Sequence, residues 1–151
     1  MKHPQLGVLE LKDDSTETMI SFDGRKIPIR IELDGVAPDA VLSFAVIIAN
    51  SLEAYDQISR EIITTDLLDA YNSGWNEYDE VQADGTTESI VNPILSSAEF
   101  KAHFLLTSVT ITGDSSVDLW YEDVKLFWGH SVFVGSLDGT DFTNARAQLF
   151  G

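Results

Sequence analysis

The residues best suited to chemistry lie in the C-terminal third of the chain, around the stretch LFWGHSVFVGSLDG at residues 126–139. This stretch places His130 next to Ser131, and it follows the carboxylates of Glu122 and Asp123. An imidazole held by a carboxylate can act as a general base or bind a divalent metal. If the strand register brings Glu122 or Asp123 beside His130, the chain holds the elements of a small hydrolase or a metal-dependent enzyme. That possible functional cluster consists of Trp120, Glu122, Asp123, Trp128 and His130.

Other features of the same stretch favour packing over catalysis. In an extended strand His130 and Ser131 point to opposite faces, so they cannot act together as base and nucleophile. The window at residues 129–133 departs from the G-x-S-x-G nucleophile elbow because Phe133 replaces the last glycine. Both faces of the predicted strand are apolar, which is typical of a central strand covered on two sides. We therefore expect His130 to be a buried, hydrogen-bonded core residue, and we assign no catalytic residue.

The composition and spacing of ligand-forming residues indicate no cofactor site. The chain has no cysteine, which excludes thiolate nucleophiles, disulfides and Cys-based zinc or iron–sulfur sites. Its three histidines lack the H-x-H or H-x-x-x-H spacing of a zinc site. A calcium loop aligned from Glu80 fails because its twelfth position is Val91 instead of glutamate. The ten glycines form no phosphate-binding motif, so we predict neither a metal nor another cofactor.

The charge is the least ordinary property of the chain. Nine basic residues stand against 25 acidic ones, which gives a formal net charge of −16. Between Arg30 and Lys101 the only basic residue is Arg60. Such a field repels nucleic acid and anionic lipid, and it speeds encounters with a basic protein. The charge thus predicts a basic protein partner and disfavours nucleic acid and membrane, unless it serves only to keep the protein in solution.

The segment at residues 76–92 is the main candidate for a binding surface. It is rich in acidic residues and has no hydrophobic periodicity, so we predict a loop. Aromatic side chains beside carboxylates suit an interface that accepts arginine or lysine from a partner. The alternative is a solvated loop whose tryptophan belongs to the core. The candidate binding residues are Trp75, Glu77, Tyr78, Asp79, Glu80 and Asp84.

The elements that position these residues predict a single α+β domain over residues 1–151, because a chain of this length is the size of one ordinary domain. Hydrophobic alternation predicts three strands at residues 6–11, 18–22 and 26–33, with a hairpin turn at Asp23-Gly24. Helices are expected from Asp39, over residues 63–75, and after a cap at Ser96 or Ser97. Four strands follow at residues 105–112, 117–122, 127–134 and 142–149. Short links favour antiparallel pairing, so we predict an antiparallel sheet of about seven strands in the order βββ-αα(α)-ββββ with helices packed on it.

Four stretches carry a resemblance that covers most of the chain. They are LGVLE at residues 6–10, the Asp23-Gly24 turn with Lys26, AYNSGW at the end of a helix, and above all LFWGHSVFVGSLDGTDF. Together they resemble a bacterial family of small acidic proteins with a domain of unknown function, in which a strand motif close to FWGHS precedes an Asp-Gly hairpin. The resemblance implies an α+β fold and supplies no catalytic residues. It also implies a loose relationship to immunity proteins that pair with secreted bacterial toxins.

Three functions stay open at this point. The favoured one is a cytoplasmic, non-enzymatic binding domain that meets a basic protein, for example a toxin that it neutralises. The cytoplasm is expected because the first residues lack the apolar core of a signal peptide and no stretch is long enough to span a membrane. The alternatives are the small hydrolase or metal-dependent enzyme built on His130, and a structural subunit that associates with itself. The sequence leaves the oligomeric state open.

Overall fold

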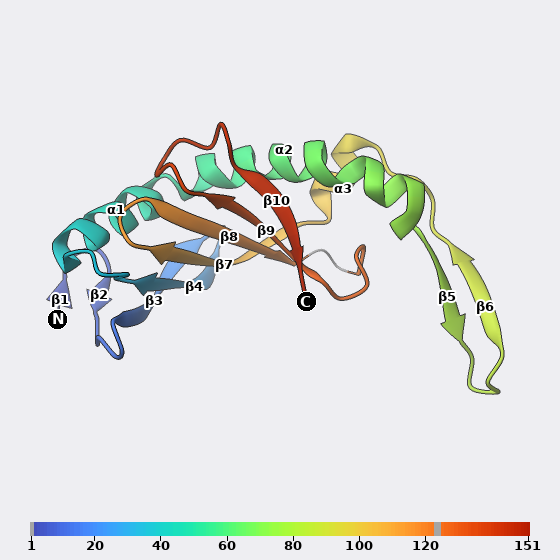
Figure 1. Ribbon diagram of the computed structural model, residues 1–151, viewed down its shortest axis with the longest axis horizontal. Coiled ribbons are helices and arrows are strands. Elements are labelled where there is room, and N and C mark those ends of the chain that lie inside the picture. Colours follow the sequence, from blue (N-terminus) through green and yellow to red (C-terminus); the bar gives the residue numbers. More distant parts are fainter. Residues whose placement is uncertain (1, 123–124) are drawn as a thin grey trace.

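The computed structural model describes residues 2–122 and 125–151, and a mixed six-stranded sheet is its largest element (Figure 1). The strand order is β10-β9-β8-β7-β4-β3. The strands are β3 (Ser15–Phe22), β4 (Arg25–Glu32), β7 (Leu105–Thr112), β8 (Ser116–Glu122), β9 (Ser131–Ser136) and β10 (Arg146–Phe150). Helices α1 (Pro38–Asn50) and α2 (Leu52–Ala70) run along one side of this sheet. The α+β class is confirmed, whereas the purely antiparallel sheet of seven strands is wrong in detail.

The smaller elements lie at the ends of the molecule. One two-stranded sheet is formed by β1 (Lys2–His3) and β2 (Gly7–Val8), and a second one by β5 (Glu77–Val81) and β6 (Thr87–Val91). Helix α2 continues into a π-helical turn, η1 (Tyr71–Trp75), and α3 (Ser97–Ala102) follows β6. No helix in the described part of the chain is long and apolar enough to cross a membrane.

The first long hairpin follows directly from the sequence pattern. In β4 the side chains of Ile27, Ile29 and Ile31 are buried, because alternate residues of a strand face the same side and this side is covered by α1. The turn before β4 is made by Asp23 and Gly24, both with positive φ, at 49° and 73°. Two consecutive residues of this kind give the backbone twist that antiparallel strands need, and the predicted hairpin turn is confirmed.

The sheet is mixed because β4 lies parallel to β7, with Ile29 opposite Val109. The prediction assumed that strands with short links follow one another around the sheet, which holds for the pairs β3–β4, β7–β8, β8–β9 and β9–β10. Between β4 and β7 the chain passes through three helices and a hairpin. Strands joined by such a long crossover are free to pair in parallel, which a two-residue turn does not allow.

The predicted strands at both ends of the chain are confirmed only in part. At the N-terminus only Gly7–Val8 pairs with another strand, while Leu6 and Leu9 are buried side chains of the core. At the C-terminus β10 begins at Arg146, and Phe142 lies before it in a loop where it stacks on Tyr55 at 5.1 Å between ring centroids. In both places apolar residues reach the core from irregular backbone, which hydrophobicity alone does not distinguish from a strand.

Two of the helix predictions need only adjustment, and the third is confirmed. The first helix begins at Pro38, a favoured residue in the first turn because it has no N–H to satisfy. The second begins at Leu52, eleven residues before the expected start at residue 63, and ends in the π-helical turn. Ser96 caps α3 as predicted, since its side chain accepts a hydrogen bond from the Glu99 N–H while the Glu99 side chain accepts one from the Ser96 N–H.

Candidate binding site

The acidic segment is a hairpin and not the loop that was predicted. Residues 77–91 form β5, a turn and β6, and we call this hairpin the arm. Figure 1 shows the arm standing away from the six-stranded sheet at the end of α2. Among the strands that the structure describes, β5 and β6 pair only with each other. Because neither face of the arm is covered, its side chains show no apolar–polar alternation, and this is why the pattern indicated a loop.

The arm carries five carboxylates and no basic residue. They are Glu77, Asp79, Glu80, Asp84 and Glu88. Glu80 and Glu88 are direct partners in the register, so their side chains project from the same face of the hairpin. Like charges directly opposite each other destabilise a strand pair. The arm therefore holds an unfavourable charge pair at a position where a cation from another molecule would stabilise it.

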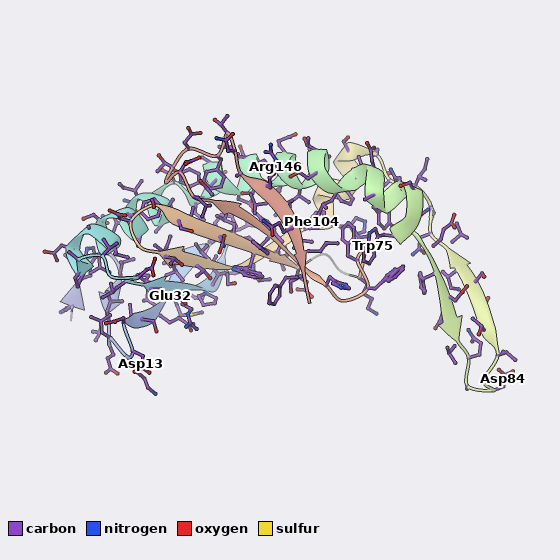
Figure 2. The ribbon with its side chains drawn as sticks, viewed as in Figure 1. Asp13, Glu32, Trp75, Asp84, Phe104 and Arg146 are labelled. Atoms are coloured by element: carbon purple, nitrogen blue, oxygen red, sulfur yellow. The ribbon has the colours of Figure 1, made fainter. Side chains whose placement is uncertain are left out.

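Two of the remaining acidic side chains of the arm, Asp84 and Asp79, accept local hydrogen bonds. Asp84, at the outer tip in Figure 2, accepts hydrogen bonds from the N–H of Thr86 at 2.9 Å and from its hydroxyl at 2.6 Å. These bonds favour the ionised carboxylate and lower the pKa of Asp84. Further along, the Ser89 hydroxyl donates to Asp79 Oδ1 at 2.9 Å. The arm is thus negatively charged along its whole length.

Two asparagines fix the base of the arm. The Asn76 side chain is buried and donates from Nδ2 to the Asn92 carbonyl at 3.0 Å. One turn earlier, Asn72 donates to the Leu95 carbonyl at 2.9 Å and accepts from the Leu95 N–H at 2.8 Å. These bonds satisfy backbone groups where the chain enters and leaves the arm. The arm is consequently attached to the end of α2 at a defined position.

The second part of the site is the turn at residues 125–129, where a strand was predicted to begin at residue 127. Positive φ angles occur at Lys125 (75°), Trp128 (54°) and Gly129 (85°), and such a backbone cannot continue a strand. As a result Phe127 is fully buried, whereas Trp128 is 54% exposed. The strand β9 begins only at Ser131, and it is buried on one face instead of two. We call residues 125–129 the Trp128 turn.

Trp75 links the arm to the Trp128 turn. It is half-buried, and its ring centroid lies 4.5 Å from that of Trp128, 5.4 Å from Phe127 and 5.6 Å from His130. The indole N–H of Trp128 donates to the Trp75 carbonyl at 3.2 Å. Figure 2 shows Trp75 at the junction between the sheet and the arm. Trp75 therefore packs as part of an aromatic cluster and supports the exposed ring of Trp128 from behind.

His130 is half-buried and hydrogen-bonded, where a fully buried core residue was expected. Its Nδ1 lies 2.8 Å from the Phe127 carbonyl, so this nitrogen carries the proton in the neutral ring. Glu122 is exposed at the end of β8, and none of the hydrogen bonds between described residues joins it to His130. Asp123 lies outside the described residues. Glu122 therefore does not hold the His130 imidazole as the carboxylate partner of a general base would.

The four described residues of the possible functional cluster do not all come together. Trp128 and His130 share the aromatic cluster around Trp75. Trp120 instead lies on β8, where its ring packs against Phe133 at 4.6 Å and against Phe150 at 5.6 Å. In the ranges 2–122 and 125–151, no three His, Asp or Glu side chains gather as a metal-binding group.

A groove lies between the arm and the Trp128 turn. Its volume is about 1150 Å³, and it is lined on the arm by Glu77, Tyr78 and Asp79 and on the turn by Lys125, Trp128 and Gly129. His103 and the buried Tyr71 line it from the body of the protein. Burial raises the pKa of Tyr71 and keeps its hydroxyl neutral. Three of the six predicted binding residues thus border one concave surface, while Glu80 and Asp84 extend beyond it along the arm.

The sequence did not reveal the part that Trp128 plays in this surface. It was placed on a core strand because its neighbours are apolar. The signal that could have shown the turn is Gly129 followed by the polar pair His130-Ser131, a combination that interrupts an apolar run more often at a turn than inside a buried strand.

Comparison with known proteins assigns a family and no activity. A family described as an uncharacterized protein conserved in bacteria, DUF2262, matches residues 3–146 of the chain. The searches of the curated proteins and of the solved structures found no match to this chain.

Proposed function

The chain belongs to the bacterial DUF2262 family, and we propose that it is a non-enzymatic binding protein whose groove and arm receive a basic segment of a partner protein. The observation that carries this proposal is the uncovered acidic arm bordering a groove of about 1150 Å³. In this proposal the protein acts in the cytoplasm, and its partner is a basic protein such as a toxin that it neutralises.

The walls of the groove favour a polypeptide segment as its occupant. One wall is the two-stranded hairpin of the arm, and the groove between it and the Trp128 turn has a volume of about 1150 Å³. An isolated two-stranded hairpin is only marginally stable in water. A partner segment lying against the arm would add the packing surface that the arm lacks.

The charge of the arm favours a basic segment. Beyond the groove, a lysine or arginine from the partner would lie between the carboxylates of Glu80 and Glu88 and remove the repulsion between them. These two side chains project from the face of the arm opposite to that of Glu77 and Asp79, so they test the arm and not the groove. The net charge of −16 would speed the approach of the same partner over a longer distance. Association is then expected to become faster as the salt concentration falls.

The test compares two pairs of substitutions that change the net charge by the same amount. Glu80→Gln with Glu88→Gln removes the charge pair from the arm, and Glu10→Gln with Asp114→Asn removes two exposed charges from the body. The probe is an eleven-residue peptide of alternating glycine and arginine, titrated by calorimetry at several salt concentrations.

We expect the peptide to bind the wild-type protein and the body variant alike, and the arm variant at least about fivefold more weakly, because close charge pairs are worth about 1 kcal/mol or more. Equal weakening by the two variants would mean that only the overall charge acts and would overturn the proposed site. Absence of binding to the wild-type protein would overturn the proposed function.

A further inference from the structure

The backbone at Trp128 is held in a conformation that a bulky side chain rarely adopts. Its φ of 54° lies in the left-handed region, where the side chain crowds the following carbonyl. Holding a residue there costs on the order of 1–3 kcal/mol. In this conformation 54% of the large apolar side chain of Trp128 is exposed to solvent at the edge of the groove. The same turn buries Phe127 in the core, but the ring of Trp128 itself gains no such burial.

The ring of Trp128 is fixed in one orientation. Its only polar group, the indole N–H, already donates to the Trp75 carbonyl at 3.2 Å. One side of the ring contacts Trp75, which is itself held by edge-to-face contacts with Phe127 and His130. What remains for a ligand is therefore aromatic surface without a hydrogen-bonding group. Such surface attracts cations electrostatically, because the face of an indole ring carries partial negative charge.

The opposite wall of the groove supplies carboxylates. Glu77 and Asp79 are two residues apart on β5, so their side chains project from the same face of the arm, and both line the groove. Asp79 Oδ1 accepts the Ser89 hydroxyl, which leaves Oδ2 for another donor. Lys125 and His103 line the groove from the body of the protein, opposite the arm.

We infer that the groove takes an arginine side chain of the partner, with the guanidinium lying on Trp128 and its N–H groups directed to Glu77 and Asp79. This inference rests on the proposed function and specifies the chemistry of the segment that is bound. A guanidinium is planar, stacks on an aromatic face and donates in two directions at once. An ammonium is a compact, strongly hydrated charge that gains less from a flat ring. The site therefore discriminates arginine from lysine.

The experiment uses two peptides that differ only in this side chain. One alternates glycine with arginine over eleven residues, and the other has lysine at every arginine position. The quantity measured is the ratio of the two dissociation constants at one salt concentration. We expect the arginine peptide to bind the wild-type protein about 2- to 30-fold more tightly, which corresponds to the roughly 0.5–2 kcal/mol of a cation–π contact.

Substitutions then locate the selectivity. Trp128→Leu should bring the ratio close to one, because leucine keeps apolar bulk and loses the ring. Trp120→Leu is the matched control on the sheet, where the ring packs on Phe133, and it should leave the ratio unchanged. Glu77→Gln with Asp79→Asn should weaken the arginine peptide more than the lysine peptide. If Trp128→Leu lowers the unfolding midpoint, Trp128→Phe replaces it and should give an intermediate ratio, since phenylalanine binds cations less strongly than tryptophan.

The outcomes separate this inference from the proposed function. Equal affinities for the two peptides, or a ratio that Trp128→Leu does not change, would overturn the arginine site while leaving the acidic arm as a binding surface. Failure of both peptides to bind would instead overturn the proposed function, as stated above.

Discussion

At the scale of single residues, Asp56 on α2 is the most consequential buried charge. Its Oδ1 accepts the Tyr121 hydroxyl at 2.7 Å, and its Oδ2 pairs with Arg60 Nε at 3.0 Å. Arg60 also donates to the Lys101 carbonyl at 2.9 Å and lies over the Tyr121 ring. The network ties α2 to β8 and to α3. Removing the carboxylate would leave a buried hydroxyl and a largely buried cation without their partner.

Asp56→Ala should therefore lower the free energy of unfolding by about 3 kcal/mol, the lower end of the range for breaking a buried ion pair. Tyr121→Phe should cost only about 1–2 kcal/mol, because it removes one hydrogen bond and leaves the ion pair intact. Glu53→Ala, at an exposed position on the same helix, is the control. Urea unfolding followed by circular dichroism measures all three, and a loss at Asp56 no larger than at Glu53 would contradict the prediction.

The same network predicts a dependence of stability on alkaline pH. Burial and the negative charge of Asp56 raise the pKa of Tyr121 well above its usual range. A tyrosine in the unfolded chain loses its proton near pH 10, so above that pH the unfolded state is favoured relative to a folded state that keeps the proton. The free energy of unfolding should fall as the pH rises above about 10. The fall should be shallower in Tyr121→Phe, and parallel curves for the two proteins would contradict this.

A second residue-scale prediction concerns Asp118 and Gly135, which face each other on β8 and β9. Burial raises the pKa of Asp118, so its ionised form is disfavoured in the folded protein. Asp118→Asn should stabilise the protein at neutral pH, and the gain should vanish below about pH 4, where the carboxyl is protonated in both states. Thermal unfolding across this pH range measures the gain, and a gain that persists at pH 3 would contradict the assigned cause.

The contact between these two residues can be tested separately. A Cβ added at Gly135 would lie 2.7 Å from Asp118 Oδ1, closer than atoms in contact allow. Gly135→Ala should thus cost less than the roughly 1–3 kcal/mol of overpacking a rigid core, because the carboxylate at the end of the Asp118 side chain can move, and this cost should disappear when Asp118 is also alanine. A double-mutant cycle with additive effects would show that the carboxylate is not the cause.

At the scale of elements, the sequence predicted helices and strands best where buried side chains recur at a regular spacing. The strands β4 and β7 and the cap of α3 were located to within one residue, because each has a one-sided apolar pattern or a defined capping pair. The arm was missed since it has no buried face to produce a pattern. The Trp128 turn was missed because Leu126, Phe127 and Trp128 are apolar and suggested a buried strand. The shape of the turn is set by three positive φ angles instead. The binding surface was accordingly predicted on the arm side, whereas Trp128 on the turn side was predicted only as part of the possible functional cluster.

The arm is expected to be the least protected strand pair of the protein. Its backbone hydrogen bonds are exposed on both faces, and local opening of such elements is cheap. In hydrogen–deuterium exchange, amides of residues 77–91 should exchange faster than those of β7 and β8. Asn72→Ala should speed this exchange further, because it removes both hydrogen bonds that hold Leu95 at the base of the arm. Equal rates of amide exchange in the arm and in β7 and β8 would contradict this expectation.

At the scale of the whole molecule, the arm should be separable from the fold. Glu77 and Val91 lie opposite each other, so replacing residues 78–90 by Asn-Gly would close the gap with a two-residue hairpin turn. The thermal midpoint should change by no more than a few degrees, because a loss near 1 kcal/mol shifts a protein of this size by roughly 2–4 °C. The shortened protein should lose affinity for the arginine peptide. A cooperative transition that disappears on shortening would mean that the arm is part of the folding unit.

The parallel pairing of β4 with β7 has one more consequence. These neighbouring strands belong to the two halves of the chain, and the arm with its tip at Asp84 lies between them along the sequence. A protease that nicks the tip would generate two fragments whose strands meet at the β4–β7 pair within one sheet, so the nicked protein should elute as one particle and dissociate only in denaturant. Expressed separately, the same two fragments should reassemble by complementation, and the gap at the arm would then serve as a place to insert a reporter.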